Sequence, residues 1–85
     1  MENEKLFNEL RAIIADVIEV NEDEIQGDSR FGQDLDVDSV KALEIMVAVE
    51  RKYKIKIDEA RLSKIRNLND TVALTKEFIE AGSTH

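Results

Sequence analysis

The chain contains no cysteine and no proline, and its only histidine is His85. The absence of cysteine excludes disulfide bonds and thiolate metal ligands. A lone histidine at position 85 also removes imidazole acid–base chemistry from an ordered core. Because proline is absent and there are only three glycines, the composition suits helices better than a β fold rich in turns.

Long hydrophobic runs are absent as well. No apolar segment reaches the ~18–20 residues that a membrane span requires, and the charged segment 1–5 does not resemble a signal peptide. We therefore expect a cytoplasmic protein. Apolar residues make up 42% of the chain and charged residues 36%, which is typical of a compact soluble domain. Eighty-five residues leave room for one domain, expected to span 1–85 with an ordered core over 3–80.

The formal net charge is −7, and it is unevenly distributed along the chain. Residues 1–50 carry 14 acidic and 4 basic residues, whereas residues 51–85 carry 5 acidic and 8 basic ones. An acidic protein of this kind repels the phosphates of nucleic acid. We therefore expect basic protein partners and no nucleic acid.

Hydrophobic periodicity predicts an all-α fold, a small bundle of three main helices plus one short helix. Helices are predicted over 3–18, 39–53 and 69–80, with a short helical turn over 58–64 and Gly82 as the stop after the last helix. Asp38 is a natural N-cap for the second helix. The first helix is amphipathic, with one apolar stripe: Leu6, Leu10, Ile13, Ile14, Val17 and Ile18.

A connection of about twenty residues, 19–38, separates the first two main helices. Loops this long are uncommon in compact domains and are usually functional or disordered. Apolar residues recur through it at irregular intervals, and we interpret them as anchors that hold an ordered loop on the bundle: Val20, Ile25, Phe31, Leu35 and Val37.

The second helix is apolar on nearly all sides. Eight of the ten residues from 40 to 49 are apolar. One arc holds Ala42, Ile45, Met46, Val49 and Tyr53. The opposite side holds Val40, Leu43 and Val47, next to Glu44, Glu50 and Arg51. This second face is either covered by the long loop or exposed for a partner, and the helical wheel does not decide between the two.

The aspartates that precede this helix allow several chemical interpretations. Asp34, Asp36 and Asp38 have the spacing of the first calcium ligands in an EF-hand loop, but Ser39 and Ile45 stand where that loop needs glycine and glutamate. A phosphatase D-x-D motif needs a larger α/β scaffold. A nucleophilic Ser39 lacks a histidine base and a G-x-S-x-G elbow. No metal site and no catalytic residue is therefore expected, and Asp38-Ser39 alone would be an ordinary helix start.

The segment 31–40, FGQDLDVDSV, resembles the acyl carrier protein signature, in which a phenylalanine and an Asp-Leu pair lead to Asp-Ser-Leu. The resemblance continues through the second helix and the short third one, and it covers roughly residues 3–80. The downstream residues that carry it are Glu44, Ile45, Ala48, Val49, Glu50, Tyr53, Ile57, Asp58, Glu59 and Ile65.

The resemblance implies a non-catalytic carrier whose Ser39 is esterified by 4′-phosphopantetheine. A separate, magnesium-dependent phosphopantetheinyl transferase would donate this group from coenzyme A. The thiol of the arm would then hold an acyl group as a thioester, so that the cofactor supplies the sulfur that the chain lacks. A serine in the first turn of a helix suits this role, because a phosphate there lies near the positive end of the helix dipole.

The resemblance also implies that the second helix docks acyl-transferring and synthase enzymes through their basic patches, in fatty acid, lipid or related biosynthesis. A monomer is expected. The docking candidates are Asp38, Val40, Leu43, Glu44, Val47 and Glu50. Among the helices, Ile45, Met46, Val49 and Ile65 would lie near any acyl cavity, although ordinary core packing is the better explanation of these residues.

Three departures from the family pattern stand out. Asp36 takes the place of a usual glycine, and Lys41 takes that of an acidic or neutral residue. Seven bases fall within residues 51–66, where fatty-acid carriers are more acidic: Arg51, Lys52, Lys54, Lys56, Arg61, Lys64 and Arg66. We interpret them as the mark of a specialised carrier with a restricted partner set. A carrier of aminoacyl or polyketide groups and an unmodified helical interaction module remain as alternatives.

Overall fold

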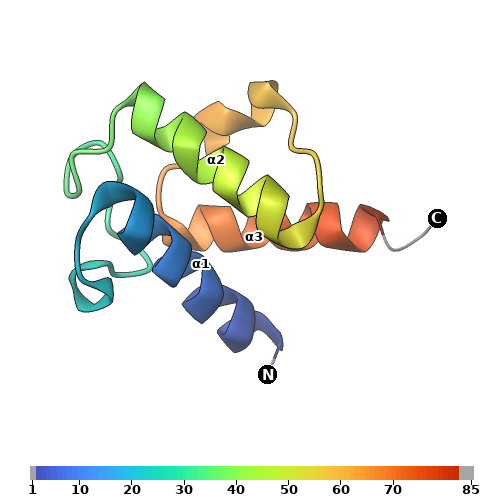
Figure 1. The fold of residues 1–85 in the computed structure, drawn as a ribbon, viewed down its shortest axis with the longest axis horizontal. Helices are drawn as coiled ribbons and strands as arrows, with labels where there is room; N and C mark the ends of the chain where they lie inside the picture. The colour runs from blue at the N-terminus through green and yellow to red at the C-terminus, as the bar shows by residue number, and fades with distance from the viewer. Residues whose placement is uncertain (1, 83–85) are drawn as a thin grey trace.

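The computed structural model describes residues 2–82, and its side chains from Glu4 to Ala81. The described residues form three α-helices and two short 3₁₀-helices and contain no strand, and Figure 1 shows how these elements are arranged. The elements in chain order are α1 (Glu2–Ile18), η1 (Glu22–Glu24), α2 (Ser39–Tyr53), η2 (Glu59–Lys64) and α3 (Leu68–Gly82), where η marks a 3₁₀-helix. The predicted all-α bundle is confirmed. The histidine at position 85 lies outside the described residues.

The helix bounds agree closely with the periodicity of the sequence. The bounds of α2 are those predicted, while η1 within the long connection was not predicted. The prediction that the last helix stops before Gly82 is wrong, because α3 continues through that residue. The physical reason is that one glycine costs a helix only about 1 kcal/mol and does not by itself end it.

Helix α1 packs against both α2 and α3, and these three helices enclose the core. The apolar stripe of α1 supplies Leu10 and Ile14, which are fully buried. From α2 come Ile45, Met46 and Val49, and from α3 comes Leu68 among others. Periodic apolar residues therefore lie in the interior as the sequence predicts.

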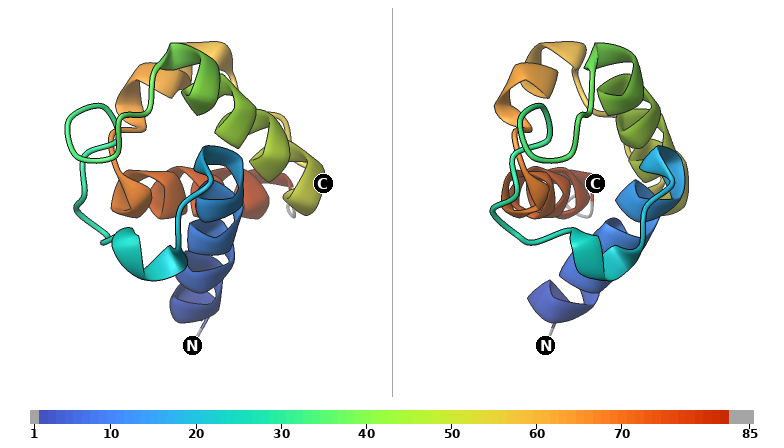
Figure 2. Two further views of the ribbon diagram at one scale, coloured as in Figure 1. Left: turned by 60° about the vertical axis from the view of Figure 1, so that its left-hand side comes forward. Right: turned by 90° about the vertical axis from the view of Figure 1, so that its left-hand side faces the viewer.

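The long connection, residues 19–38, is ordered and held by the bundle, as predicted. Ile25, Phe31 and Val37 are buried in the core cluster, and Val20 and Leu35 pack against it. Figures 1 and 2 both show this loop at the end of the bundle where α1 stops and α2 starts.

Two backbone hydrogen bonds tie the loop to the segment that leads into α3. Phe31 N donates to Arg66 O over 2.8 Å, and Asn69 N donates to Gly27 O over 3.0 Å. A Cβ at position 27 would lie 2.6 Å from the Asn69 side chain, so the glycine permits this close approach. The start of α2 is thus fixed relative to the other elements.

A side-chain hydrogen bond links the far end of α2 to α1. The Tyr53 hydroxyl donates to Glu9 Oε1 over 2.8 Å. Burial, the hydrogen bond to Glu9 and the charge of that carboxylate together raise the pKa of the Tyr53 phenol well above its usual value of 10.0.

We expect the folded chain to lose stability as pH rises above about 10. Below that pH the phenol is neutral in both states. Above it, the unfolded chain releases the proton while the folded chain retains it, so unfolding becomes easier. Tyr53 is the only tyrosine, so phenolate absorbance gives its titration directly.

The matched control is Tyr53→Phe, compared with the wild type by urea unfolding between pH 8 and 11. The difference in unfolding free energy between the two proteins should shrink as pH rises. A phenolate midpoint at or below the ordinary value would contradict the proposed contribution of burial and Glu9.

Candidate functional site

Ser39 is the first residue of α2, and its side chain is exposed. The preceding residue, Asp38, has extended backbone angles and caps the helix, with its Oδ1 accepting a hydrogen bond from Lys41 N over 2.8 Å. The predicted N-cap is therefore confirmed. The cap leaves the Ser39 hydroxyl facing solvent at the point where the anchored loop joins the helix.

The backbone N–H groups of Ser39 and Val40 make no hydrogen bond to any described residue. Such groups in a first helical turn point outward along the helix axis, and together they attract an anion. An oxyanion bonded to the Ser39 oxygen would lie close to them. The local backbone therefore suits a phosphodiester at this position.

Asp36 lies in the left-handed region with φ of 55°. Glycine is the usual residue at this position in the family that the sequence resembles. The turn requires a positive φ, and aspartate tolerates a positive φ better than most residues, so it can replace the glycine. Asp34, two residues earlier, accepts a hydrogen bond from Arg30 N over 2.8 Å. The departure at position 36 thus preserves the loop conformation.

A groove of about 630 Å³ opens beside Ser39. The loop, the first turns of α2 and the helix η2 form its walls, and Figure 2 shows η2 next to the first turns of α2. Its apolar lining comes from Phe31, Val37, Ala42, Leu62 and Ile65, and its charged lining from Arg30, Asp38, Glu59 and Arg66.

The second apolar face of α2 is exposed, which settles the question that the helical wheel left open. Val40 is 65% exposed, Leu43 39% and Val47 40%. The loop lies at the end of the bundle and does not cover these side chains. They form an apolar strip along α2, within a shallow groove of about 670 Å³.

The three predicted docking acids all have partners within the chain. Asp38 caps α2, as described above. Glu44 Oε2 lies 3.5 Å from Lys41 Nζ. Glu50 is half-buried, and its Oε2 accepts a hydrogen bond from Ile57 N over 2.7 Å. The acidic face that the sequence suggested is therefore partly engaged in intramolecular contacts.

The residues named as neighbours of an acyl cavity lie mostly in the core. Ile45, Met46 and Val49 are each at most 4% exposed. Ile65 is half-buried and lines the groove beside Ser39. Sequence reasoning did not connect Leu62 with Ser39, because only the packing of η2 against α2 brings them together.

The helical wheel placed Arg51 next to the exposed apolar face of α2, whereas Lys52 was not assigned to that face. Both side chains line the shallow groove with Val40 and Val47. The position of Arg51 follows from spacing, because residue 51 follows residue 47 by four positions, as residue 47 follows residue 43.

The aspartates before α2 do not gather into a metal site. Among the described residues, no three His, Cys, Asp or Glu side chains are placed to hold a metal ion. No helix in the described part of the chain is long and apolar enough to cross a bilayer.

Comparison with known proteins agrees with this geometry. The profile of the family described as "Phosphopantetheine attachment site" matches residues 8–75. The chain is 39% identical to "Polyketide-8 synthase acyl carrier protein 1" of Streptomyces avermitilis over 81% of this chain and 82% of that protein. It is 34% identical to the "Acyl carrier protein" of Petrotoga mobilis over 91% of each chain.

The fold also matches a solved structure. The apo doublet acyl carrier protein from prodigiosin biosynthesis superimposes with a TM-score of 0.78 at 23% sequence identity. The match covers 91% of this chain and 38% of that one. The chain belongs to the acyl carrier protein family of phosphopantetheine-binding carriers.

The prosthetic group of this family is 4′-phosphopantetheine, which is bound covalently, and it is the cofactor of this chain. The residues near the start of α2 fit such a group. The hydroxyl of Ser39 is accessible, two N–H groups beside it are free for phosphate oxygens, and the adjoining groove is mostly apolar. When bound, the arm supplies a terminal thiol that holds acyl groups as thioesters.

We expect Asp36→Gly to raise the free energy of unfolding by up to about 1 kcal/mol, because glycine adopts positive φ without steric cost. Asp36→Val should lower it by about 1–2 kcal/mol, since a β-branched residue is strained there. Urea denaturation measures both.

Asp36→Asn is the control for charge, because asparagine also tolerates the left-handed region. It should stay within about 0.5 kcal/mol of the wild type. A valine variant as stable as the glycine variant would show that the positive φ at this position imposes no constraint.

Proposed function

We propose that Ser39 is the attachment residue for the phosphopantetheine arm and that the chain presents acyl groups on this arm to partner enzymes. The observation that carries the proposal is the position of the serine: it is exposed at the first residue of α2, beside unengaged N–H groups and the groove. The other serines among residues 2–82 lack this combination. Ser29 Oγ accepts a hydrogen bond from Gln26 N in the loop, and Ser63 lies within η2.

Attachment transfers one phosphopantetheinyl group from coenzyme A to the Ser39 oxygen. The Oγ–P bond forms as the phosphoanhydride bond of coenzyme A breaks, and 3′,5′-ADP leaves. A base on the phosphopantetheinyl transferase takes the hydroxyl proton, since the described part of this chain places no base on Ser39. The role of this chain is to keep the hydroxyl accessible at the start of the helix that Asp38 caps.

We infer that the chain is itself non-catalytic and is a substrate for other enzymes. Its partners are the transferase and acyl-transferring or synthase enzymes that dock on α2. The docking residues are the exposed strip Val40, Leu43 and Val47 together with Asp38, Glu44 and Glu50. Apolar contact supplies affinity at such a surface, and charge supplies steering and register.

The remaining features of the proposal concern the setting in which the carrier works. We infer a single domain over residues 1–85 that acts as a monomer in the cytoplasm. The bases of residues 51–66 and the likeness to a polyketide synthase carrier both favour a specialised pathway over general fatty acid synthesis. The fold and groove serve acyl, polyketide and aminoacyl cargo alike, so the pathway is decided by which enzymes dock.

We expect incubation with coenzyme A, magnesium and a broad-specificity phosphopantetheinyl transferase to add the mass of one phosphopantetheinyl group to the wild type. Ser39→Ala should show no gain, because the acceptor oxygen is removed. Intact-mass spectrometry measures both.

The matched control is Ser63→Ala, which removes a hydroxyl from the same groove and should still be modified. No mass gain in the wild type would leave the helical interaction module as the better interpretation. A gain that persists in Ser39→Ala would place the attachment on a different residue.

We expect Val47→Asp to lower kcat/KM for acyl transfer by a partner enzyme about tenfold, because a charge replaces an apolar contact of the strip. The side chain is exposed, so circular dichroism and thermal unfolding should change little. Ala73→Asp, an exposed alanine on α3, is the control and should retain wild-type transfer rates. Equal losses in both variants would mean that α2 is not the docking helix.

A further inference from the structure

The shallow groove on α2 ends in positive charge. Val40, Leu43, Val47 and Ala48 form its apolar lining, and Arg51 and Lys52 close it at the end of the helix away from Ser39. Residues 40, 44, 47 and 51 recur at intervals of four, three and four, so they lie along one line of the helix. The guanidinium of Arg51 therefore continues the exposed strip by one turn, about 18 Å from the Ser39 end at 1.5 Å per residue.

The acids of α2 contribute less free negative charge than their number suggests. Glu44 is paired with Lys41, which lies on the same helix. Glu50 is turned toward the backbone N–H of Ile57 and is half-buried. Contacts of this kind reduce the field that an approaching partner meets.

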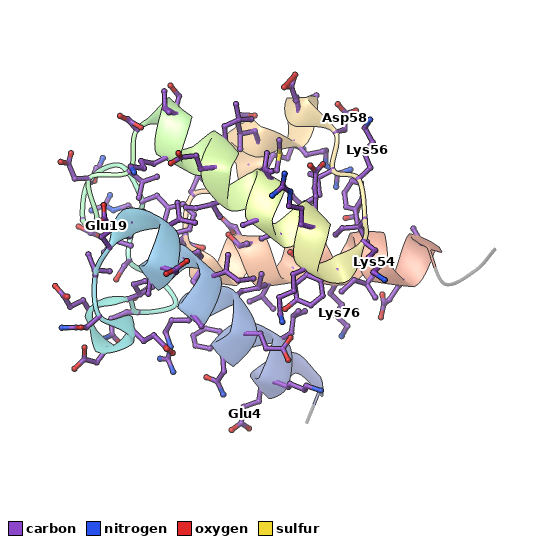
Figure 3. All side chains as sticks on the ribbon, viewed as in Figure 1. Glu4, Glu19, Lys54, Lys56, Asp58 and Lys76 are labelled. Carbon is purple, nitrogen blue, oxygen red and sulfur yellow. The ribbon has the colours of Figure 1, made fainter. Side chains whose placement is uncertain are left out.

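The bases at the end of α2 have no such compensation. The ion pairs of the described residues use Arg30, Lys41, Arg61 and Arg66. None involves Arg51, Lys52, Lys54 or Lys56, although Lys52 Nζ lies 5.7 Å from the centre of the Tyr53 ring. Figure 3 shows Lys54 at the same end of α2, and Lys56 further along the connection toward η2, near Asp58. Four bases within six residues thus face solvent without an acidic partner among the described side chains.

We propose that the enzyme that docks on α2 places carboxylates against Arg51 and Lys52, at the end of the apolar strip away from Ser39. This inference rests on the proposed function of α2 as the docking helix. Opposite charge on the partner is favoured because a basic patch there would meet unneutralised like charge, which costs affinity and slows encounter. The partner can still carry bases near the Ser39 end, where the exposed Asp36 makes no described contact.

The arrangement also gives the complex a direction. A partner with bases at one end of its docking surface and carboxylates at the other binds α2 in one orientation only, because the reversed orientation brings like charges together. In that orientation, the end of α2 that carries Ser39 lies against the basic end of the partner's docking surface. Carriers with acids along the whole helix lack this constraint, so the bases select among partners.

A second copy of this chain is a competing occupant. In an antiparallel pair of α2 helices, Arg51 of one copy would approach the acidic end of the other. The exposed strip consists of three side chains only, which is little apolar area for a stable dimer. The partner enzyme is therefore favoured, and self-association is measured as a separate outcome.

The test uses the carrier loaded with its arm and verified by intact mass, so that failure of attachment is detected before docking is measured. The acyltransferases and ketosynthases of the source genome are purified, and the one with the highest kcat/KM on the wild-type carrier is chosen. Arg51→Glu should lower its kcat/KM about tenfold at low salt, and high salt should reduce the difference. Arg51→Gln should produce a smaller loss.

Lys5→Glu is the matched control, because it makes the same change in net charge at an exposed base of α1. It should stay within about twofold of the wild type. Reversal of one acidic residue on the docking surface of the enzyme to lysine should restore activity toward Arg51→Glu.

An unchanged or increased kcat/KM in Arg51→Glu would overturn the proposal, and so would equal losses in Arg51→Glu and Lys5→Glu. Sedimentation equilibrium of the wild type provides the last outcome. A dimer that Arg51→Glu dissociates would assign this surface to a second copy of the chain instead of an enzyme.

Discussion

The burial of one face of α2 against the other helices is the packing constraint on which the rest of the structure depends. Ile45, Met46 and Val49 enter the core, while the loop and η2 contact α2 near its start. A chain of 85 residues has too few further segments to cover the opposite face of α2 as well. The apolar residues on that face therefore remain exposed to water, which is the state expected of the proposed docking surface.

The long connection acts as a positioning element. Its buried anchors Ile25, Phe31 and Val37 compensate the entropy lost when so many residues are ordered without a regular helix. Two backbone hydrogen bonds, from Phe31 N to Arg66 O and from Asn69 N to Gly27 O, fix the loop relative to the start of α3. Ser39 is consequently held at a defined place although it makes few contacts of its own. The attachment role proposed for Ser39 needs this combination of a fixed backbone and an accessible hydroxyl.

The charge that the surface of α2 presents depends more on which side chains form contacts within the chain than on the number of acidic and basic residues. The net charge of −7 suggests an acidic surface. On α2, however, Glu44 and Glu50 are engaged within the chain, whereas Arg51 and Lys52 make no ion pair with any described residue. Exposed ion pairs such as that of Lys41 with Glu44 contribute little to stability, but they alter what a partner encounters. The proposed docking face thus carries opposite charges at its two ends, which the net charge of the chain does not show.

The sequence by itself determined the helices, the order of the long loop and the position of Ser39 at the start of α2. These features follow from local periodicity, capping by Asp38 and the apolar character of the loop anchors, all of which can be read from the sequence itself. The motif around Asp38-Ser39 also identified the family. Asp36 adopts a positive φ in the structure, as expected where aspartate replaces a glycine.

Only the tertiary structure decided which face of α2 stays exposed, because this depends on where α1, α3 and the loop lie in space. It also decided that Glu50 bonds to Ile57 and that η2 forms a wall of the groove beside Ser39. Each of these contacts joins residues whose proximity has no local signal in the chain. Helical periodicity shows that α2 has two apolar faces, but only packing selects which one a partner can reach.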